Sequence, residues 1–304
     1  MHKHNHDENQ SLKNIGIALV LNFTFTIAEF IGGILTNSIA IVSDAVHDLG
    51  DTVSLGCALY FEKLSKRSPN MTYSYGYKRF SMLGALINCV VLLVGSVFVI
   101  YKAINRIIEP EEVEVKGMLL FAIAGVIING IAVLRTRKGK GVNERVVSLH
   151  LLEDVLGWVA VLIISIVMMF VDVPILDPLL SIGIALFILY NVVRNLKITL
   201  NVFLEGVPSD MNILRLKQKI ESIPVVVSVH DLHVWSLDSV YNIASIHVVV
   251  EMENNSTEAL IPIKEQIRRL MKEEAIEHVT IEFEDKNEHC IPCDKEIIKT
   301  DEKN

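Results

Sequence analysis

Hydrophobic residues occur in six long runs within the first two thirds of this 304-residue chain. A helix that crosses the hydrocarbon core of a bilayer needs about 20 mostly apolar residues, and each run meets or approaches that length. The runs are Ile15–Leu35, Ile39–Phe61, Phe80–Tyr101, Gly117–Leu134, Val146–Val171 and Ile175–Arg194. The pattern therefore predicts an all-α, six-helix transmembrane domain over residues 13–206, preceded by a polar tail at 1–12.

The last third of the chain has the pattern of a small soluble domain over residues 207–286. Apolar and polar residues alternate along two of its segments, which is typical of strands that bury one face. The predicted elements are a helix at Asp210–Ser222, strands at Val225–Ser236 and Tyr241–Glu251, a helix at Thr257–Glu274 and a strand at His278–Glu284. This αββαβ order predicts an α+β fold with two helices on one face of a three-stranded sheet. About 80 residues fold alone only marginally, so we expect the uncovered face or edge to meet a second copy.

Composition and charge agree with a multi-pass protein of the cell membrane. Hydrophobic residues make up 51% of the chain, and its mean hydropathy is +0.43. Basic residues cluster in the loops after the second and fourth runs, whereas the loops after the third and fifth runs are rich in glutamate or have no base. Basic residues accumulate on the cytoplasmic side, so both termini are predicted to be cytosolic. The first run is not a cleaved signal peptide, because Asn22 and Glu29 interrupt it and no small-residue cleavage site follows.

Ionisable residues interrupt the second run in the stretch SDAVHDLGD. They recur at positions i, i+3, i+4 and i+7, on one face of a helix, and are Asp44, His47, Asp48 and Asp51. An ionised Asp at mid-bilayer costs about 2.5 to 3.5 kcal/mol on the insertion scale, so such residues are functional by default. This helical face is therefore a candidate binding site.

The fifth run repeats part of this pattern. Its stretch HLLED places His150 and Asp154 four residues apart, with Glu153 beside them, just as His47 and Asp51 are four apart. Two imidazoles and two carboxylates from two helices make a complete tetrahedral set that suits zinc in ligand type and number. One HxxxD pair is a weak signal, but two copies within predicted membrane spans indicate a zinc site.

Four more carboxylates within the predicted spans have open roles. Asp44 and Asp48 share the face of the ligands, and we interpret them as groups that support the site or line a pathway. Glu29 is either a partner of a ligand or a water-facing group. Asp177 lies near a helix start and is either an end or cap residue or a functional group.

In these motifs the chain resembles the cation diffusion facilitators, which are six-helix metal exporters with a cytosolic ferredoxin-like or metallochaperone-like domain. The resemblance covers residues 11–285 and is carried by HDLGD (47–51), YGYKR (75–79), HLLED (150–154) and VHDLHVWSL (229–237). It implies a transport site of the zinc-type branch, formed by His47, Asp51, His150 and Asp154. Some bacterial members bind an additional metal between the second and third helices through Asp and His. Residues 67–79 contain neither, so we expect no metal there.

The resemblance also implies a cytosolic zinc site in a homodimer, with His230, His247 and Glu284 as ligands. His233 and Glu282 lie beside them on the predicted strands and are further candidates. Each histidine could instead have no metal-binding role, since a histidine on a small sheet is commonly a surface residue or a core residue whose ring nitrogens are hydrogen-bonded.

Both ends of the chain carry residue types that bind metals. The start MHKHNHDE contains His4 and His6, and the tail at 287–304 contains HCIPCD with Cys290 and Cys293. In a reducing cytosol, CxxC beside a histidine is more typical of a metal site than of a disulfide. Two cysteines supply half of a coordination shell. His4 and His6 could complete it, as tails do in some eukaryotic members, or they could form a loose scavenging tract.

These patterns predict a Zn²⁺/H⁺ antiporter that exports zinc from the cytosol by alternating access. The ligand chemistry also accepts cadmium and cobalt. No GxxxxGK[ST] phosphate loop occurs, so nothing in the sequence indicates ATP as the energy source. Zinc needs neutral imidazole and ionised carboxylate, so protons compete with it for the same side chains. His47 and His150 are the expected proton carriers, because imidazole titrates near neutral pH.

Two other functions stay open as alternatives. A membrane metallohydrolase would need three protein ligands, an open water position and a nearby base. Glu153 or Asp48 could be that base, although the sequence has no HExxH motif. A metal sensor that binds without transporting would carry the same ligands. We expect no enzymatic activity and no nucleic-acid partner.

Overall fold

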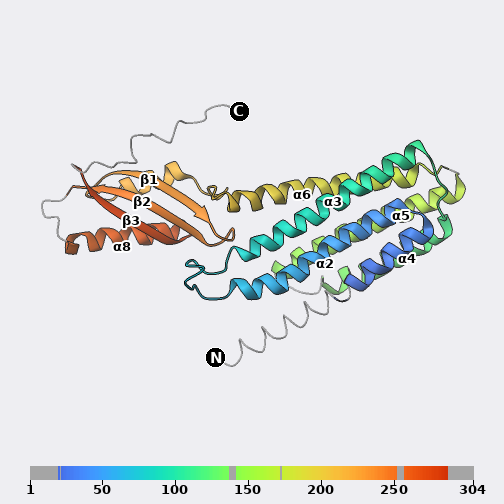
Figure 1. The fold of residues 1–304 in the computed structure, drawn as a ribbon, viewed down its shortest axis with the longest axis horizontal. Coiled ribbons are helices and arrows are strands. Elements are labelled where there is room, and N and C mark those ends of the chain that lie inside the picture. The colour runs from blue at the N-terminus through green and yellow to red at the C-terminus, as the bar shows by residue number, and fades with distance from the viewer. Residues whose placement is uncertain (1–19, 21, 137–141, 172, 252–256, 287–304) are drawn as a thin grey trace, which may run out of the picture. The chain divides into compact units, whose positions relative to one another are not determined.

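The computed structural model of the chain describes residues 20, 22–136, 142–171, 173–251 and 257–286. Within these ranges, the side chains of 55, 58, 59, 62, 132, 135, 136, 142–151, 153 and 257 are not described. The chain forms two compact units, Met1–Leu196 and Lys197–Asn304. Helices make up the regular structure of the first unit in its described part, whereas the second unit contains a sheet (Figure 1).

Helices occupy all six predicted membrane runs within the described residues. The first helix covers residues 22–36. The others are α2 (Ile39–Ser65), α3 (Phe80–Ile108), α4 (Val115–Thr136), α5 (Val142–Phe170) and α6 (Leu176–Phe203). By length and composition, α3 and α6 can each cross a membrane, and α4 and α5 contain shorter apolar segments. Helix α2 has 27 residues, but Asp44, Asp48 and Asp51 interrupt its apolar run.

Helix α2 takes part in two separate buried clusters. In one, Ile41 packs with Trp158 of α5 and with apolar residues of α4. In the other, apolar residues of α2 pack with α3 and α6. Glycines allow the helices to approach closely: a Cβ at Gly125 of α4 would lie 2.1 Å from the Trp158 ring, and one at Gly50 of α2 would lie 2.3 Å from the Leu92 side chain of α3. Helix α2 is thus in contact with both groups of helices.

A two-residue corner, Asn37 and Ser38, joins the first helix to α2. The Ser38 N–H donates to the Gly33 carbonyl at 3.0 Å, and the Asn37 N–H donates to the Ile34 carbonyl at 3.3 Å. This pair of bonds is a Schellman motif, which needs a residue with positive φ. Asn37 has a φ of 53°, which asparagine adopts more readily than most residues. The chain can therefore reverse direction within two residues.

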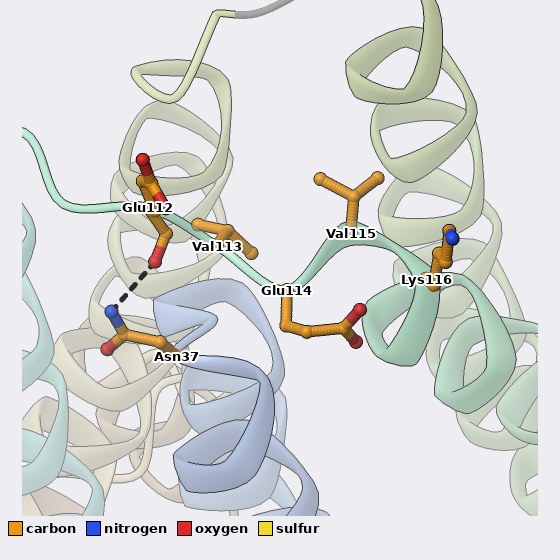
Figure 2. A pocket seen from close by; sticks show the side chains of 6 residues that line it. All are labelled: Asn37, Glu112, Val113, Glu114, Val115 and Lys116. Atoms are coloured by element: carbon orange, nitrogen blue, oxygen red, sulfur yellow. Dashed lines mark hydrogen bonds between the residues drawn. The ribbon is translucent and has the colours of Figure 1, made fainter.

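The side chain of Asn37 lies at the wall of a pocket beside this corner (Figure 2). The pocket is lined by Asn37, Glu112, Val113, Glu114, Val115 and Lys116. Asn37 Nδ2 donates to the backbone oxygen of Glu112 at 2.9 Å. Arg106 of α3 donates to the backbone oxygen and to Oδ1 of Asn37, at 2.6 Å each, and forms an ion pair of 2.8 Å with Glu111. These bonds tie the loop between α3 and α4 to the start of α2.

Asp177 of α6 caps α2, a helix that the sequence did not indicate as its partner. Its Oδ1 accepts hydrogen bonds from Ser38 Oγ at 2.5 Å and from the Ala40 N–H at 3.2 Å. Its Oδ2 accepts from the Ile39 N–H at 2.8 Å. Ser38 Oγ, in turn, accepts from the Ile41 N–H at 3.3 Å. The Asp177 side chain is fully buried, so bulk water does not stabilise its charge. The first N–H groups and the positive dipole end of α2 stabilise that charge instead.

The second unit has the predicted αββαβ order. Its elements are α7 (Ile213–Glu221), β1 (Val226–Ser236), β2 (Asn242–Val250), α8 (Thr257–Glu273) and β3 (Ile276–Asp285). Strand β2 is central, antiparallel to β1 and parallel to β3. Leu216 of α7 and Ile267 of α8 pack in one core with Ile246 and Val248 of β2. Side chains alternate along a strand, so the intervening residues of β2 point to the face that neither α7 nor α8 covers.

Asp177→Ala should destabilise the first unit (the helical unit, Met1–Leu196), because two N–H groups and one hydroxyl lose a buried acceptor. Hydrogen bonds to charged groups contribute about 1.5 to 3 kcal/mol each, so we expect a loss of at least about 2 kcal/mol. Asp177→Asn keeps one carbonyl oxygen as an acceptor and should cost less. Thermal unfolding in detergent measures the midpoints of the wild type, Asp177→Asn and Asp177→Ala, which should decrease in that order. An unchanged midpoint for Asp177→Ala would show that the cap contributes no stability.

Candidate metal centres

Side chains of α2 and α5 converge inside the helical unit. One ligand atom each from His47, Asp51 and Asp154 lies within 4.8 Å of the other two. His47 Nε2 is 3.7 Å from Asp154 Oδ1, and the two side chains are 21% and 10% exposed. Zinc bonds to nitrogen and oxygen are about 2.0 to 2.2 Å long, so donors at these separations can reach one ion after small shifts. Three of the four expected ligand positions are thus brought together.

The fourth expected position, His150, lies on α5, but its side chain is outside the described residues. Residues four apart on a helix project from the same face. The backbone of α5 therefore puts His150 on the face of Asp154, one turn before it. The side chain of Glu153, the candidate base of the hydrolase alternative, is also outside the described residues.

Asp48 meets the first helix, while His47 and Asp51 meet α5. Asn22 Nδ2 of the first helix donates to the backbone oxygen of Asp48 at 3.1 Å and to Thr52 Oγ1 at 3.0 Å. Asp44 and Asp48 are both buried. Helix α2 thus contacts the first helix through the backbone oxygen of Asp48, whereas a Cβ at Gly157 of α5 would lie 3.3 Å from Asp44 Oδ1.

From the sequence, Asn22 is only a polar residue that interrupts an apolar run. Asn22, Thr26 and Glu29 are spaced at i, i+4 and i+7 in that run. This spacing puts them on one side of a helix. It is the signal that could have indicated a polar contact with another helix.

The cytosolic candidates lie on the sheet face opposite the helices. His230 of β1 is directly across from His247 of β2. Glu284 of β3 is paired with Val249, two residues along β2 from His247. Residues two apart on a strand share a face, so the register brings the two imidazoles and the carboxylate to one place.

The three predicted cytosolic ligands are in contact with one another. His247 Nδ1 lies 2.5 Å from Glu284 Oε1, and His230 Nε2 lies 3.1 Å from Glu284 Oε2. The Glu284 side chain is 7% exposed, less than either histidine. Two nitrogen donors and one oxygen donor fit zinc and leave a fourth coordination position open. The donor set and its spacing therefore fit a bound metal ion.

Two further carboxylates lie near the other nitrogen of His247. Glu282 Oε2 and Asp231 Oδ2 are 3.4 Å and 3.5 Å from His247 Nε2. His233 is 55% exposed and lies 2.9 Å from Asp231 Oδ1; it is not in the group formed with Glu284. The position of Asp231 depends on a β-bulge between His230 and His233, where Asp231 has a φ of 48°. No residue pattern in the sequence marks this bulge.

The expected tail site cannot be placed in the fold. His4, His6, Cys290 and Cys293 all lie outside the described residues. Within the described part of the chain, the two groups above are those in which at least three His, Cys, Asp or Glu side chains share a possible metal position.

Two family models match consecutive parts of the chain. The cation efflux transmembrane domain matches residues 15–204, and the cytoplasmic domain of cation efflux proteins matches residues 208–286. The first match alone covers more than half of the chain, and it contains α2 and α5, the helices that carry His47, Asp51 and Asp154. The second contains the whole of the described sheet.

Individual proteins match over nearly the full length. The chain is 33% identical to a Bacillus subtilis protein named cadmium, cobalt and zinc/H(+)-K(+) antiporter, with 97% of each chain covered. It is 35% identical to the metal cation efflux system protein CzcD of Cupriavidus metallidurans, over 97% of this chain and 91% of that one. The solved metal-bound C-terminal domain of a CzcD transporter is 31% identical over 24% of this chain and 99% of the domain, with a TM-score of 0.22. The chain therefore belongs to the cation efflux family of membrane transporters.

Proposed function

We propose that the protein exports Zn²⁺ from the cytosol in exchange for protons. The observation that carries the proposal is the convergence of His47 and Asp51 of α2 with Asp154 of α5, within the part of the chain that matches an efflux transmembrane domain. The name of the Bacillus subtilis relative supports it, since that protein is named for antiport of cadmium, cobalt and zinc. The relatives are named as transporters, so we infer transport rather than hydrolysis.

The transported ion would be bound by His47, Asp51, His150 and Asp154. Two imidazole nitrogens and two carboxylate oxygens complete a tetrahedral shell for zinc, and cadmium and cobalt accept the same donors. The four residues come from two helices. A small movement of α2 relative to α5 would therefore change both the access to the ion and the strength of its binding, as alternating access requires.

The same side chains would couple zinc to protons. Zinc binds neutral imidazole and ionised carboxylate, so its arrival releases any protons that these groups hold. His47 and His150 would be the proton carriers, because imidazole is the side-chain type suited to proton exchange near neutral pH. Moving a divalent cation out against an inside-negative potential costs about 4.6 kcal/mol per 100 mV, and proton entry offsets part of this cost.

The orientation follows from the basic loops. We infer that the segments after α2 and α4, which carry most of the flanking lysines and arginines, face the cytosol. Both termini and the second unit would then be cytosolic in a cell-membrane protein. The glutamate-rich loop between α3 and α4 would be on the outer side.

The second unit would bind zinc and support a homodimer. His230, His247 and Glu284 provide three donors, and a fourth could come from water or from a second copy. Zinc that binds only the folded state stabilises it, which matters for a domain of about 80 residues. On donor chemistry alone, Cys290 and Cys293 with His4 and His6 would form an additional cytosolic site.

Asp51→Ala and Asp154→Ala should each abolish zinc transport. Loss of a group that merely orients a metal ligand reduces affinity by about 10- to 100-fold, so loss of a ligand carboxylate should lower zinc flux by at least about tenfold. Zinc entry into proteoliposomes under an imposed pH gradient measures this flux. Asp210→Ala changes an exposed carboxylate of the second unit and serves as the control. Wild-type flux in either ligand variant would rule out the site.

Glu284→Gln should remove zinc from the cytosolic site while leaving the transport site intact. The carboxylate is the buried donor of that site, so we expect its zinc affinity to fall by at least about tenfold. Glu277→Gln changes an exposed carboxylate on the same strand and is the matched control. Calorimetric titration of the purified protein should show one fewer zinc per chain only in Glu284→Gln. Equal stoichiometry in both variants would exclude Glu284 as a ligand.

A further inference from the structure

The first helix presents a polar stripe to α2 beside the transport site. Asn22 donates to the backbone of Asp48 and to Thr52, and Thr26 Oγ1 lies 3.5 Å from Thr52 Oγ1. Glu29 continues the stripe by one turn. These contacts fix which side of the first helix faces α2, and they direct Glu29 toward α2 and away from lipid.

Glu29 is buried without a hydrogen-bond donor. Its side chain is among the largest fully buried ones, with 1% of the residue exposed. Neither of its carboxylate oxygens accepts a hydrogen bond from a donor in the described part of the chain. A buried acceptor that lacks a donor costs about 1 to 3 kcal/mol, and more when it is charged. The ionised form of Glu29 is therefore poorly accommodated here.

The described ionisable groups that act on Glu29 are all acidic. The carboxyl group of Asp48 lies within hydrogen-bonding reach, and Asp44 of α2 and Asp154 of α5 act on Glu29 from farther away. The first helix has no other charged residue between positions 22 and 36. Among the described residues, no lysine, arginine or histidine contributes to this environment of Glu29. Among the described side chains, the site thus has an excess of carboxylates and no fixed positive charge.

One proton shared by Glu29 and Asp48 reduces the excess negative charge and needs no further side chain. Two carboxylates in hydrogen-bonding contact repel each other, and one of the two is neutral in such pairs. If Glu29 is protonated, its O–H can donate to Asp48, which gives both groups a partner. A zinc ion is a poorer occupant, because these donors are all oxygens and zinc sites in proteins favour nitrogen and sulfur.

We propose that Glu29 is a proton-binding site of the transporter, separate from the metal ligands. The proposal rests on the Zn²⁺/H⁺ exchange proposed above and assigns it one carrier of its own. Without zinc, Glu29 holds a proton and donates a hydrogen bond to Asp48. When zinc enters from the cytosol, its positive charge favours the ionised carboxylate, so the O–H bond breaks and the proton passes to cytosolic water. After zinc leaves on the outer side, Glu29 takes up a proton there.

Glu29→Gln tests this role. Glutamine has the shape of a protonated glutamic acid and can donate to Asp48, but it cannot release a proton. Zinc flux and internal pH are recorded together in proteoliposomes of the full-length protein. We expect Glu29→Gln to bind zinc in a calorimetric titration and to move fewer protons per zinc than the wild type. Glu29→Asp keeps a titratable carboxyl group and should restore the ratio.

Two results would overturn the role of Glu29. One is an equal proton-to-zinc ratio in the wild type and in Glu29→Gln. The other is loss of zinc binding at the transport site in Glu29→Gln, because Glu29 would then be part of the metal site itself. A wild-type protein that moves zinc without any protons would instead refute the proposed antiport, and the role of Glu29 with it.

Discussion

An ionised side chain inside a bilayer persists only where another group compensates its charge, since an uncompensated Asp costs about 2.5 to 3.5 kcal/mol at the centre of a helix. The helical unit satisfies this constraint in different ways. Asp177 gives its oxygens to the hydroxyl and N–H groups at the start of α2. Asp51 and Asp154 point with His47 at one place, where a divalent cation can compensate them. Among the described residues Glu29 has no such partner, and we propose that a proton neutralises it.

The two candidate metal centres differ in what holds their proposed ligands. In the second unit, the paired strands fix His230 opposite His247, and Glu284 is buried against both. In the helical unit, the ligands come from α2 and α5, which can shift relative to each other without breaking backbone hydrogen bonds. His47 lies eight residues after Ile39, about 12 Å along α2 at 1.5 Å per residue. The cap from Asp177 thus anchors one end of α2, about two helical turns before the ligand region. A rigid site suits a retained ion, and an adjustable one suits an ion that must leave.

Most of the fold and the ligand pairs could be predicted from the sequence, because both depend on local periodicity. Long apolar runs mark the helices, alternation marks the strands, and a spacing of four puts His47 and Asp51 on one side of α2. Periodicity does not tell which helix that side meets. The contact between Asp177 and Ile39 joins residues 138 positions apart, and the bulge at Asp231 depends on backbone conformation. Asn22 and Glu29 gain their meaning only from the first helix lying against α2.

Zinc export and proton entry are coupled, in this proposal, through carboxylates and imidazoles of the helical unit. The most direct measurement records zinc movement by the wild-type protein in proteoliposomes before and after an ionophore collapses the proton gradient. The account predicts that zinc accumulates against its own gradient while the proton gradient lasts, with protons moving the opposite way, and that accumulation stops on collapse. Zinc accumulation that continues unchanged after the proton gradient has been removed would contradict it.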